Sequence, residues 1–265
     1  MQRMSKPTSQ LFDVLESAVR QYNTPGFIPA DPISIPHRFS RLQDREIMGF
    51  WTATLAWGQR KTILQSANRL VELMDGAPFD FVQQHEERDR ERFLAFKHRT
   101  FQATDTLYFL EFLQQYYRRH TSLEQAFARH LQAGDATVEN ALLGFHRDFF
   151  DHPYAPERTR KHVATPERGS TCKRLNMFLR WMVRRDAAGV DFGDWHSIRP
   201  SQLLIPLDVH VERVARRMGL LSRPQTDWKA VLELTENLRR FDPADPVKYD
   251  FALFGIGVLE KPGDR

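Results

Sequence analysis

The sequence contains a single cysteine, Cys172, among its 265 residues. One cysteine cannot form a disulfide within the chain, and it cannot supply the four thiolates that hold an iron–sulfur cluster. This scarcity excludes a disulfide-stabilised secreted domain and a cluster protein of that kind. It fits the reducing cytoplasm, where we expect the protein to lie.

Long apolar runs are also missing. No window approaches the roughly 18 uninterrupted apolar residues of a membrane span. The start, MQRMSKPTSQ, leads into an amphipathic segment rather than into the apolar stretch of a secretory signal. We therefore expect a protein without a membrane partner.

Alternation with a period of two, the mark of strands, is nearly absent, and helical spacing takes its place. Apolar residues recur three and four positions apart along most of the chain. The segments with this spacing are 9–22, 44–74, 105–120, 122–131, 137–150, 173–186, 209–218, 228–241 and 247–261. The pattern predicts an all-α fold of about nine helices.

Positive charge is concentrated in one part of the chain. The whole sequence has 38 Lys and Arg against 34 Asp and Glu, a net charge of +4, and its pI is about 9.3. Residues 156–186 alone hold nine Lys or Arg and three Asp or Glu, a local net charge of +6. Such a patch attracts polyanions, most often nucleic acid, although a solvated surface rich in arginine gives the same count.

Residues 205–219, IPLDVHVERVARRMG, place one acidic residue between an apolar run and a helix. The apolar residues after it share one helix face and Gly219 follows as a stop, so the helix begins near residue 209. An Asp before the first turn accepts backbone N–H bonds and meets the positive end of the helix dipole, which is worth about 1 kcal/mol. The sequence predicts that Asp208 caps this helix, and a cap is compatible with a catalytic role.

The segment RGSTCKRLNMFLRWMV leads from a small-residue turn at Gly169 and Ser170 into a helix whose first turn contains Lys173 and Arg174. Cations are unusual there, because the positive end of the helix dipole disfavours them. A lysine whose ammonium form is destabilised can act as a nucleophile. The alternative is an exposed lysine that touches phosphate or nothing, and the same helix end is a ready phosphate site.

Four segments together resemble the helix-hairpin-helix DNA glycosylases, the superfamily that includes endonuclease III and the 8-oxoguanine DNA glycosylases. They are IPLDVHVERVARRMG, GSTCKRLNMFLR, TATLAWGQRKTILQSANRL and YDFALFGIGV. The interval from Lys173 to Asp208 is 35 residues, which is longer than in endonuclease III and nearer to that of the archaeal 8-oxoguanine glycosylases. The chain is also similar to a group of uncharacterised bacterial proteins.

The resemblance implies one all-α domain over residues 1–265, folded as two lobes around a central cleft. Lobe 1 would take about 1–45 and 209–265, and lobe 2 about 46–208, with the hairpin near 165–185. The resemblance also implies that Asp208 is the catalytic carboxylate and that Lys173 is the lysine that attacks the sugar. This scheme uses no cofactor and no metal.

A pocket for the damaged base is implied at Trp57, Gln59, Asp250 and Phe254. Asp250 and Phe254 are four positions apart, so they share one helix face. Phe254 would stack on a base flipped out of the duplex, and Asp250 would accept a hydrogen bond from its Watson–Crick edge. Guanine and 8-oxoguanine present N–H donors there.

Contacts to DNA phosphates are expected from the backbone at Gly169 and Ser170 and from the side chains of Arg174 and Lys61. We expect His210 to be structural, because no second metal ligand follows it four positions on.

These features predict a DNA glycosylase with an associated lyase activity that removes oxidised purines, 8-oxoguanine first among them, from double-stranded DNA. We expect a monomer in the cytoplasm, associated with the nucleoid. The alternative is a non-catalytic helical binder of damaged or bent DNA, against which the presence of both Lys173 and Asp208 argues. A helix-turn-helix regulator would be a compact dimeric module rather than a chain of this length.

Overall fold

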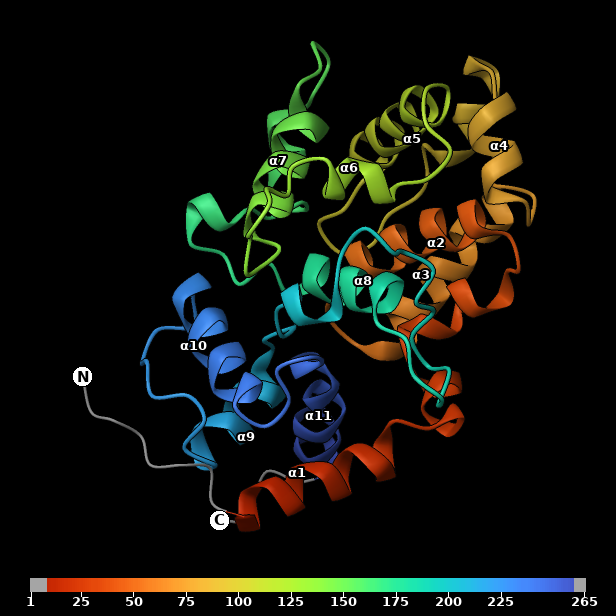
Figure 1. The fold of residues 1–265 in the computed structure, drawn as a ribbon. Helices are drawn as coiled ribbons and strands as arrows, with labels where there is room; N and C mark the ends of the chain where they lie inside the picture. Colours follow the sequence, from red (N-terminus) through yellow and green to blue (C-terminus); the bar gives the residue numbers. More distant parts are fainter. Residues whose placement is uncertain (1–8, 260–265) are drawn as a thin grey trace. The chain divides into compact units, whose positions relative to one another are not determined.

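The structure, a computed structural model, describes residues 9–259 as α-helices joined by loops and short 3₁₀ helices (Figure 1). The α-helices are α1 (Ser9–Tyr22), α2 (Leu42–Leu55), α3 (Arg60–Leu73), α4 (Pro78–Gln84), α5 (Ala103–Tyr117), α6 (Glu124–Ala128), α7 (Glu139–Phe150), α8 (Lys173–Val183), α9 (Val209–Arg217), α10 (Trp228–Arg239) and α11 (Tyr249–Leu259). The 3₁₀ helices are Pro25–Ala30, Pro32–Ser34, Pro36–Arg38, Glu87–Phe93, Glu157–Lys161, Pro166–Arg168, Pro200–Gln202 and Pro246–Lys248. Within residues 9–259 there is no β-strand, so the expected all-α fold is confirmed. None of the described helices is long and apolar enough to cross a bilayer.

The described chain divides into two compact units. Unit 1 takes residues 9–27, 134–138 and 166–259, and unit 2 takes residues 28–133 and 139–165. These bounds differ from those of the two expected lobes, because residues 166–208 group with the C-terminal helices. The arrangement of two lobes around a cleft stays a prediction.

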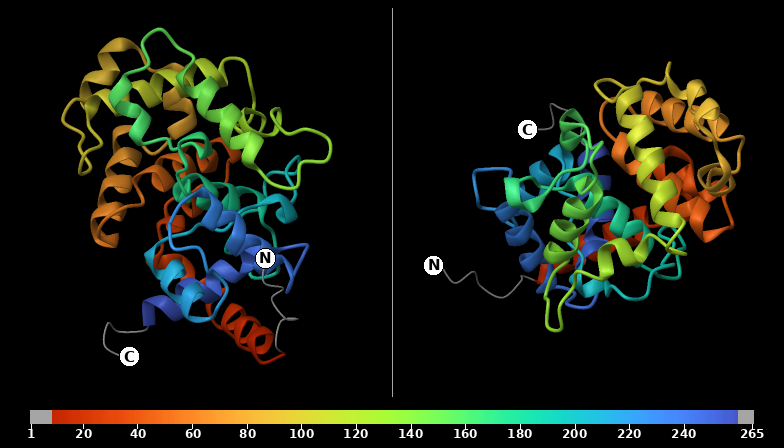
Figure 2. Two further views of the ribbon diagram at one scale, coloured as in Figure 1. Left: turned by 90° about the vertical axis from the view of Figure 1, so that its left-hand side faces the viewer. Right: turned by 90° about the horizontal axis from the view of Figure 1, so that it is seen from above.

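Helix α11 lies at the centre of unit 1 and packs against both α1 and α9 (Figures 1 and 2). Its sequence is apolar on most sides, as is typical of a helix enclosed by others. Two glycines let the neighbours come close. A Cβ at Gly255 would lie 2.3 Å from the Tyr22 ring of α1, and a Cβ at Gly257 would lie 3.0 Å from His210 of α9. The ends of the described chain thus meet in one core.

Aromatic side chains fill the core of unit 2. Phe50 of α2 stacks on Phe109 of α5 with 5.2 Å between ring centroids, and it meets Phe145 and Phe149 of α7 edge-on. All four side chains are buried. Ring pairs of this kind contribute about 0.5–1.5 kcal/mol each beyond the burial of their area. They fix the position of α2 and of the connection that follows it.

The prediction of a single helix over residues 44–74 is wrong, because this segment forms two helices. Helix α2 ends at Leu55 and α3 begins at Arg60, and Gly58 between them has a φ of 99°. This region of backbone conformation favours glycine, which has no Cβ. The side chain of Arg99 fills the space, with its Nη1 2.8 Å from the place of a Cβ at Gly58. The chain therefore turns at Gly58, between the end of α2 and the start of α3.

Candidate active site

The candidate site in unit 1 begins at the turn before α8. Gly169 has a φ of 71°, and its carbonyl accepts a hydrogen bond of 2.9 Å from the N–H of Trp228. Cys172, directly before the helix, is buried and also left-handed, with a φ of 48°. The turn ends sharply, so that α8 begins directly at Lys173.

Lys173 faces Asp208, the residue directly before α9. The Lys173 Nζ lies 3.7 Å from Asp208 Oδ2, and the two side chains are 28% and 16% exposed. This distance is within reach of an ion pair but longer than a direct hydrogen bond. Both groups keep some access to solvent. The fold brings them together although 35 residues separate them in the chain.

The two oxygens of Asp208 have different contacts. Oδ1 accepts hydrogen bonds from the backbone N–H of His210 at 2.8 Å and of Val211 at 2.9 Å, which caps α9. Oδ2 is the oxygen that lies 3.7 Å from Lys173. The predicted cap is therefore present, and it holds the carboxylate in an orientation that leaves its second oxygen beside the lysine.

Asp250, in the first turn of α11, is buried and bonded to Arg180 of α8. Its Oδ2 accepts a hydrogen bond from Arg180 Nη1, and the Asp250 side chain is only 9% exposed. Arg180 Nε also donates to Asp191 at 3.2 Å. One oxygen of Asp250 thus has a partner within the protein, while its expected contact with a flipped base stays a prediction.

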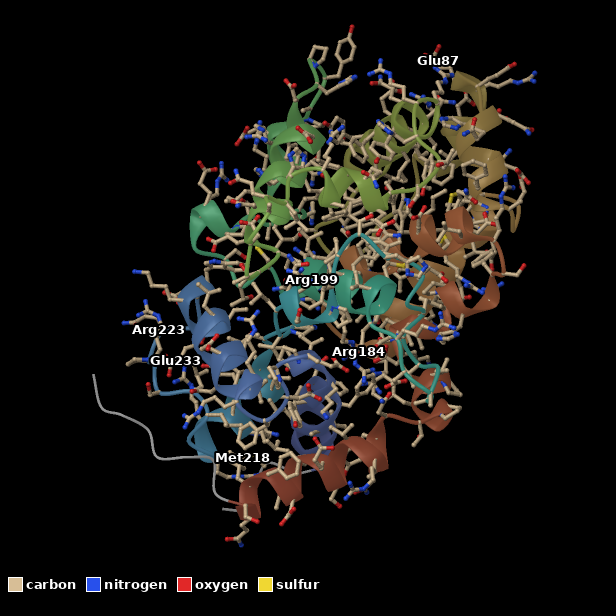
Figure 3. The ribbon with its side chains drawn as sticks, in the orientation of Figure 1. Glu87, Arg184, Arg199, Met218, Arg223 and Glu233 are labelled. Carbon is tan, nitrogen blue, oxygen red and sulfur yellow. The ribbon has the colours of Figure 1, made fainter. Side chains whose placement is uncertain are left out.

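Arg184, at the end of α8 (Figure 3), extends this buried network. Its guanidinium donates to Asp191 at 3.1 Å, to Asp186 at 2.6 Å and to Asp245 at 2.9 Å. Burial opposes its charge, but these carboxylates outweigh the burial and raise the pKa of Arg184. Removing one partner of a buried ion pair costs about 3–5 kcal/mol, so the network ties α8 to the chain segments around it.

Burial raises the pKa of the Asp250 carboxyl to about 7. The negative charges of Asp208 and Asp191 also raise it, whereas the positive charges of Arg180 and Lys173 lower it. Asp250 therefore interacts electrostatically with both members of the Lys173–Asp208 pair. The three side chains form one electrostatic cluster, which contains a carboxyl that titrates near neutral pH.

Phe254 lies one helical turn after Asp250 and is half-buried. Its ring meets Phe27 edge-on at 6.3 Å and His210 at 6.0 Å between centroids. His210 is one of the two residues whose N–H groups Asp208 caps. Phe254 therefore lies next to the first turn of α9 without being fully buried.

The other predicted phosphate contacts of unit 1 surround the start of α8. Gly169 is exposed, and the Ser170 hydroxyl accepts a hydrogen bond of 3.2 Å from the N–H of Cys172. Arg174 is half-buried, and desolvation lowers the pKa of its guanidinium to about 10, so that it stays charged at neutral pH. Their contact with phosphate stays a prediction.

Three predicted site residues belong to unit 2. Trp57 is half-buried, with His98 edge-on at 5.9 Å and the Arg99 guanidinium 4.7 Å from its ring centroid. Gln59 is the exposed residue directly before α3, and Lys61 is exposed in its first turn. They therefore belong to a different unit from Lys173 and Asp208.

Internal ion pairs use part of the positive charge of residues 156–186. Arg158 pairs with Asp105, whose side chain is fully buried, and Arg180 and Arg184 pair with the carboxylates described above. The local charge of +6 counted from the sequence therefore exceeds what this segment can offer to a polyanion.

Arg180 is the main residue that the sequence analysis missed. Its signal is an arginine inside the apolar stretch MFLRWMV of α8, because a buried charge needs a partner of opposite charge. The sequence does not say which of the 34 acidic residues supplies that partner.

The fold and the site define an all-α protein with a lysine and an aspartate paired at the starts of two helices. The chain belongs to the family described as "Protein of unknown function (DUF2400)", whose model matches residues 31–259. The match includes Lys173, Asp208 and Asp250. The assignment to the helix-hairpin-helix DNA glycosylase superfamily is therefore wrong, because the family that matches is a different one. No curated protein and no solved structure matches the chain.

Proposed function

We propose that this protein is an enzyme that removes a damaged base from double-stranded DNA and then cleaves the strand, acting on oxidised purines and above all on 8-oxoguanine. The observation that carries the proposal is the Lys173–Asp208 pair, an amine and a carboxylate 3.7 Å apart and both partly exposed. The capping bonds to His210 and Val211 orient the carboxylate before any substrate arrives.

An amine beside a carboxylate suits displacement at a sugar carbon. Asp208 accepts a proton from the ammonium group of Lys173 and passes it to the departing base, so that it is again a carboxylate beside the positive charge that develops on the sugar. The Nζ lone pair bonds to C1′, and the base leaves with the electron pair of the C1′–N bond and with that proton. The C1′–O4′ bond then breaks, O4′ takes up the proton that Nζ releases, and a Schiff base forms between Nζ and C1′.

Strand cleavage follows from the Schiff base. Loss of a proton from C2′ drives β-elimination, in which the C3′–O bond breaks and the phosphate leaves with its electrons. Hydrolysis of the remaining Schiff base releases Lys173. The protein, the DNA and water supply all the groups that form bonds or transfer protons in these steps.

Charge supports DNA as the partner. The net charge is +4 and the pI about 9.3, and Gly169, Ser170 and Arg174 lie at the N-terminus of α8, where a phosphate is favoured. The target base has to leave the stack before an amine can reach C1′, and the half-buried Phe254 would stack on it. The enzyme would act as a monomer on the nucleoid, in the cytoplasm.

The test is to incubate the protein with duplexes that each carry one damaged base, add borohydride, and look for a covalent adduct. We expect an adduct with an 8-oxoguanine duplex, and peptide mapping should place the sugar remnant on Lys173. Lys173→Gln should lose both the adduct and strand nicking. Lys229→Gln is the matched control, because Lys229 is exposed in the first turn of α10 in the same unit, and it should react like the wild type.

Two other outcomes would decide against parts of this proposal. An adduct on Lys61 would remove Lys173 as the nucleophile. If lesion duplexes are bound but none yields an adduct or an abasic site, the protein is a non-catalytic binder of damaged DNA.

A further inference from the structure

Helix α11 holds both helices that carry the reacting pair. At its start, Asp250 is bonded to Arg180 of α8. Further along, the Gly257 carbonyl accepts a hydrogen bond of 2.5 Å from Arg213 of α9, and the missing side chain of Gly257 lets α9 come close. The spacing between the starts of α8 and α9, and so between Lys173 and Asp208, depends on α11.

Asp250 and Lys173 are linked through one face of α8. Lys173 and Arg180 are seven residues apart, which is about two helical turns, so both lie on the same face. Arg180 holds the Asp250 carboxylate against that face. Asp250 is buried there, and its charge acts on Lys173 through a medium that screens it less than water does.

We propose that Asp250 is a positioning residue that sets the reactivity of Lys173, by holding α8 to α11 through Arg180 and by placing a second carboxylate charge near the amine. The meaning of this role for catalysis rests on the proposed function, whereas its effect on Lys173 can be measured without DNA. The charged groups that act on Asp250 are Arg180 and Lys173 of α8, Asp208 before α9, and Asp191 in the loop after α8.

The experiment is trace acetylation of the full-length, DNA-free protein with acetic anhydride between pH 6 and pH 10, with the labelling rate of each lysine read by mass spectrometry. In Asp250→Asn, Lys173 should be labelled faster than in the wild type above about pH 7, because a lost negative charge favours the neutral amine. Near pH 8 the labelling should be up to about tenfold faster. Lys229 serves as the reference inside the same protein and should not change.

Two further variants separate charge from a merely structural role. Asp250→Glu keeps the charge and should restore the wild-type profile of Lys173. Asp245→Asn removes a carboxylate from the same network, but one that binds Arg184 instead of Arg180, and it should leave the profile unchanged. An equal shift in Asp245→Asn, or no shift in Asp250→Asn, would overturn the proposal.

The wild type provides a test even if Asp250→Asn does not fold. Because the Asp250 carboxyl titrates near pH 7, the labelling rate of Lys173 relative to that of Lys229 should fall as the pH rises through 7, and a constant ratio would contradict the proposal. Borohydride trapping on a duplex with an abasic site should show the same shift in Asp250→Asn. No trapping at any pH would contradict the proposed function and leave the labelling result intact.

Discussion

At the scale of single residues, the two oxygens of Asp208 have different roles. Oδ1 caps α9, and Oδ2 lies beside Lys173. Asp208→Asn should abolish base excision, because an amide cannot offset the positive charge on the sugar. The amide oxygen still accepts the bonds from His210 and Val211, so the free energy of unfolding should change by less than about 1 kcal/mol. Excision assays on 8-oxoguanine duplexes and urea denaturation measure the two effects.

The matched control for Asp208 is the cap of α10. Asp227 accepts a bond of 3.1 Å from the N–H of Ala230, and it also pairs with Arg223. Asp227→Asn changes a cap of the same kind in the same unit and should leave excision intact. Normal excision by a folded Asp208→Asn protein would reduce Asp208 to a plain helix cap.

Phe254 and Phe251 on α11 differ in exposure, and this difference separates binding from stability. Phe254→Ala should weaken binding of a lesion duplex by about 1–3 kcal/mol, the usual scale of a base stacked on an aromatic ring. Phe251 is buried under the Arg180 guanidinium, 4.4 Å from its ring centroid, so Phe251→Ala should cost about 3–5 kcal/mol of stability. Binding titrations with undamaged DNA and thermal unfolding are the controls. If Phe254→Ala mainly lowers stability, its ring belongs to the core.

At the scale of helices, local signals decided which elements could be predicted. Helix α9 has a cap at Asp208, a buried face of apolar residues and a stop at Gly219, and all three lie within its own segment. The break at Gly58 has no such signal, because the apolar spacing continues on both sides of it. The Arg99 side chain, 41 residues away, fills the space beside Gly58, and this contact cannot be predicted from the local sequence.

The same limit applies to the candidate site. The sequence predicts that Lys173 and Asp208 each stand at the start of a helix, because capping and periodicity are local. It does not predict from the residues alone that Nζ and Oδ2 lie 3.7 Å apart, nor that Arg180 binds an aspartate 70 positions away. These contacts depend on how α8, α9 and α11 pack.

Gly58→Ala tests the connection between α2 and α3. A residue with a Cβ is strained at a φ of 99°, at a cost of about 1–3 kcal/mol, and it would also displace Arg99 from 2.8 Å. Gly76→Ala is the control, since Gly76 has a φ of 73° but nothing within 4 Å of the added Cβ. Urea denaturation should show a larger loss for Gly58→Ala. Equal losses of unfolding free energy in the two variants would mean that the Arg99 side chain moves away from the added Cβ at no cost.

At the scale of the whole molecule, each unit contains a buried carboxyl with a shifted pKa, and the two shifts have opposite directions. In unit 2, burial would raise the pKa of Asp105, but the His162 ring 3.5 Å away and hydrogen bonds from the Gln102 N–H and Thr159 outweigh it and lower the pKa to about 2. In unit 1, burial raises the pKa of Asp250 to about 7. A lowered carboxyl pKa stabilises the fold above pH 4, and a raised one makes the fold less stable as the pH rises from about 4 to 7.

The acid side of this linkage can be measured. The stabilisation from Asp105 should be present above about pH 4 and lost as the pH falls toward 2, and a shift of about two pKa units corresponds to about 2–3 kcal/mol. Urea denaturation between pH 2 and pH 6 should show this slope in the wild type and a shallower one in Asp105→Asn. Parallel slopes would mean that other carboxyls dominate acid unfolding.

The double use of Asp208 also has an evolutionary consequence. Asp and Asn cap helices about equally well, so selection for a stable fold alone does not distinguish them at position 208. Their codons differ in one base. One mutation would therefore turn the proposed enzyme into a folded protein that still binds damaged DNA without excising the base. An active enzyme and an inactive DNA-binding protein would then differ by a single base change.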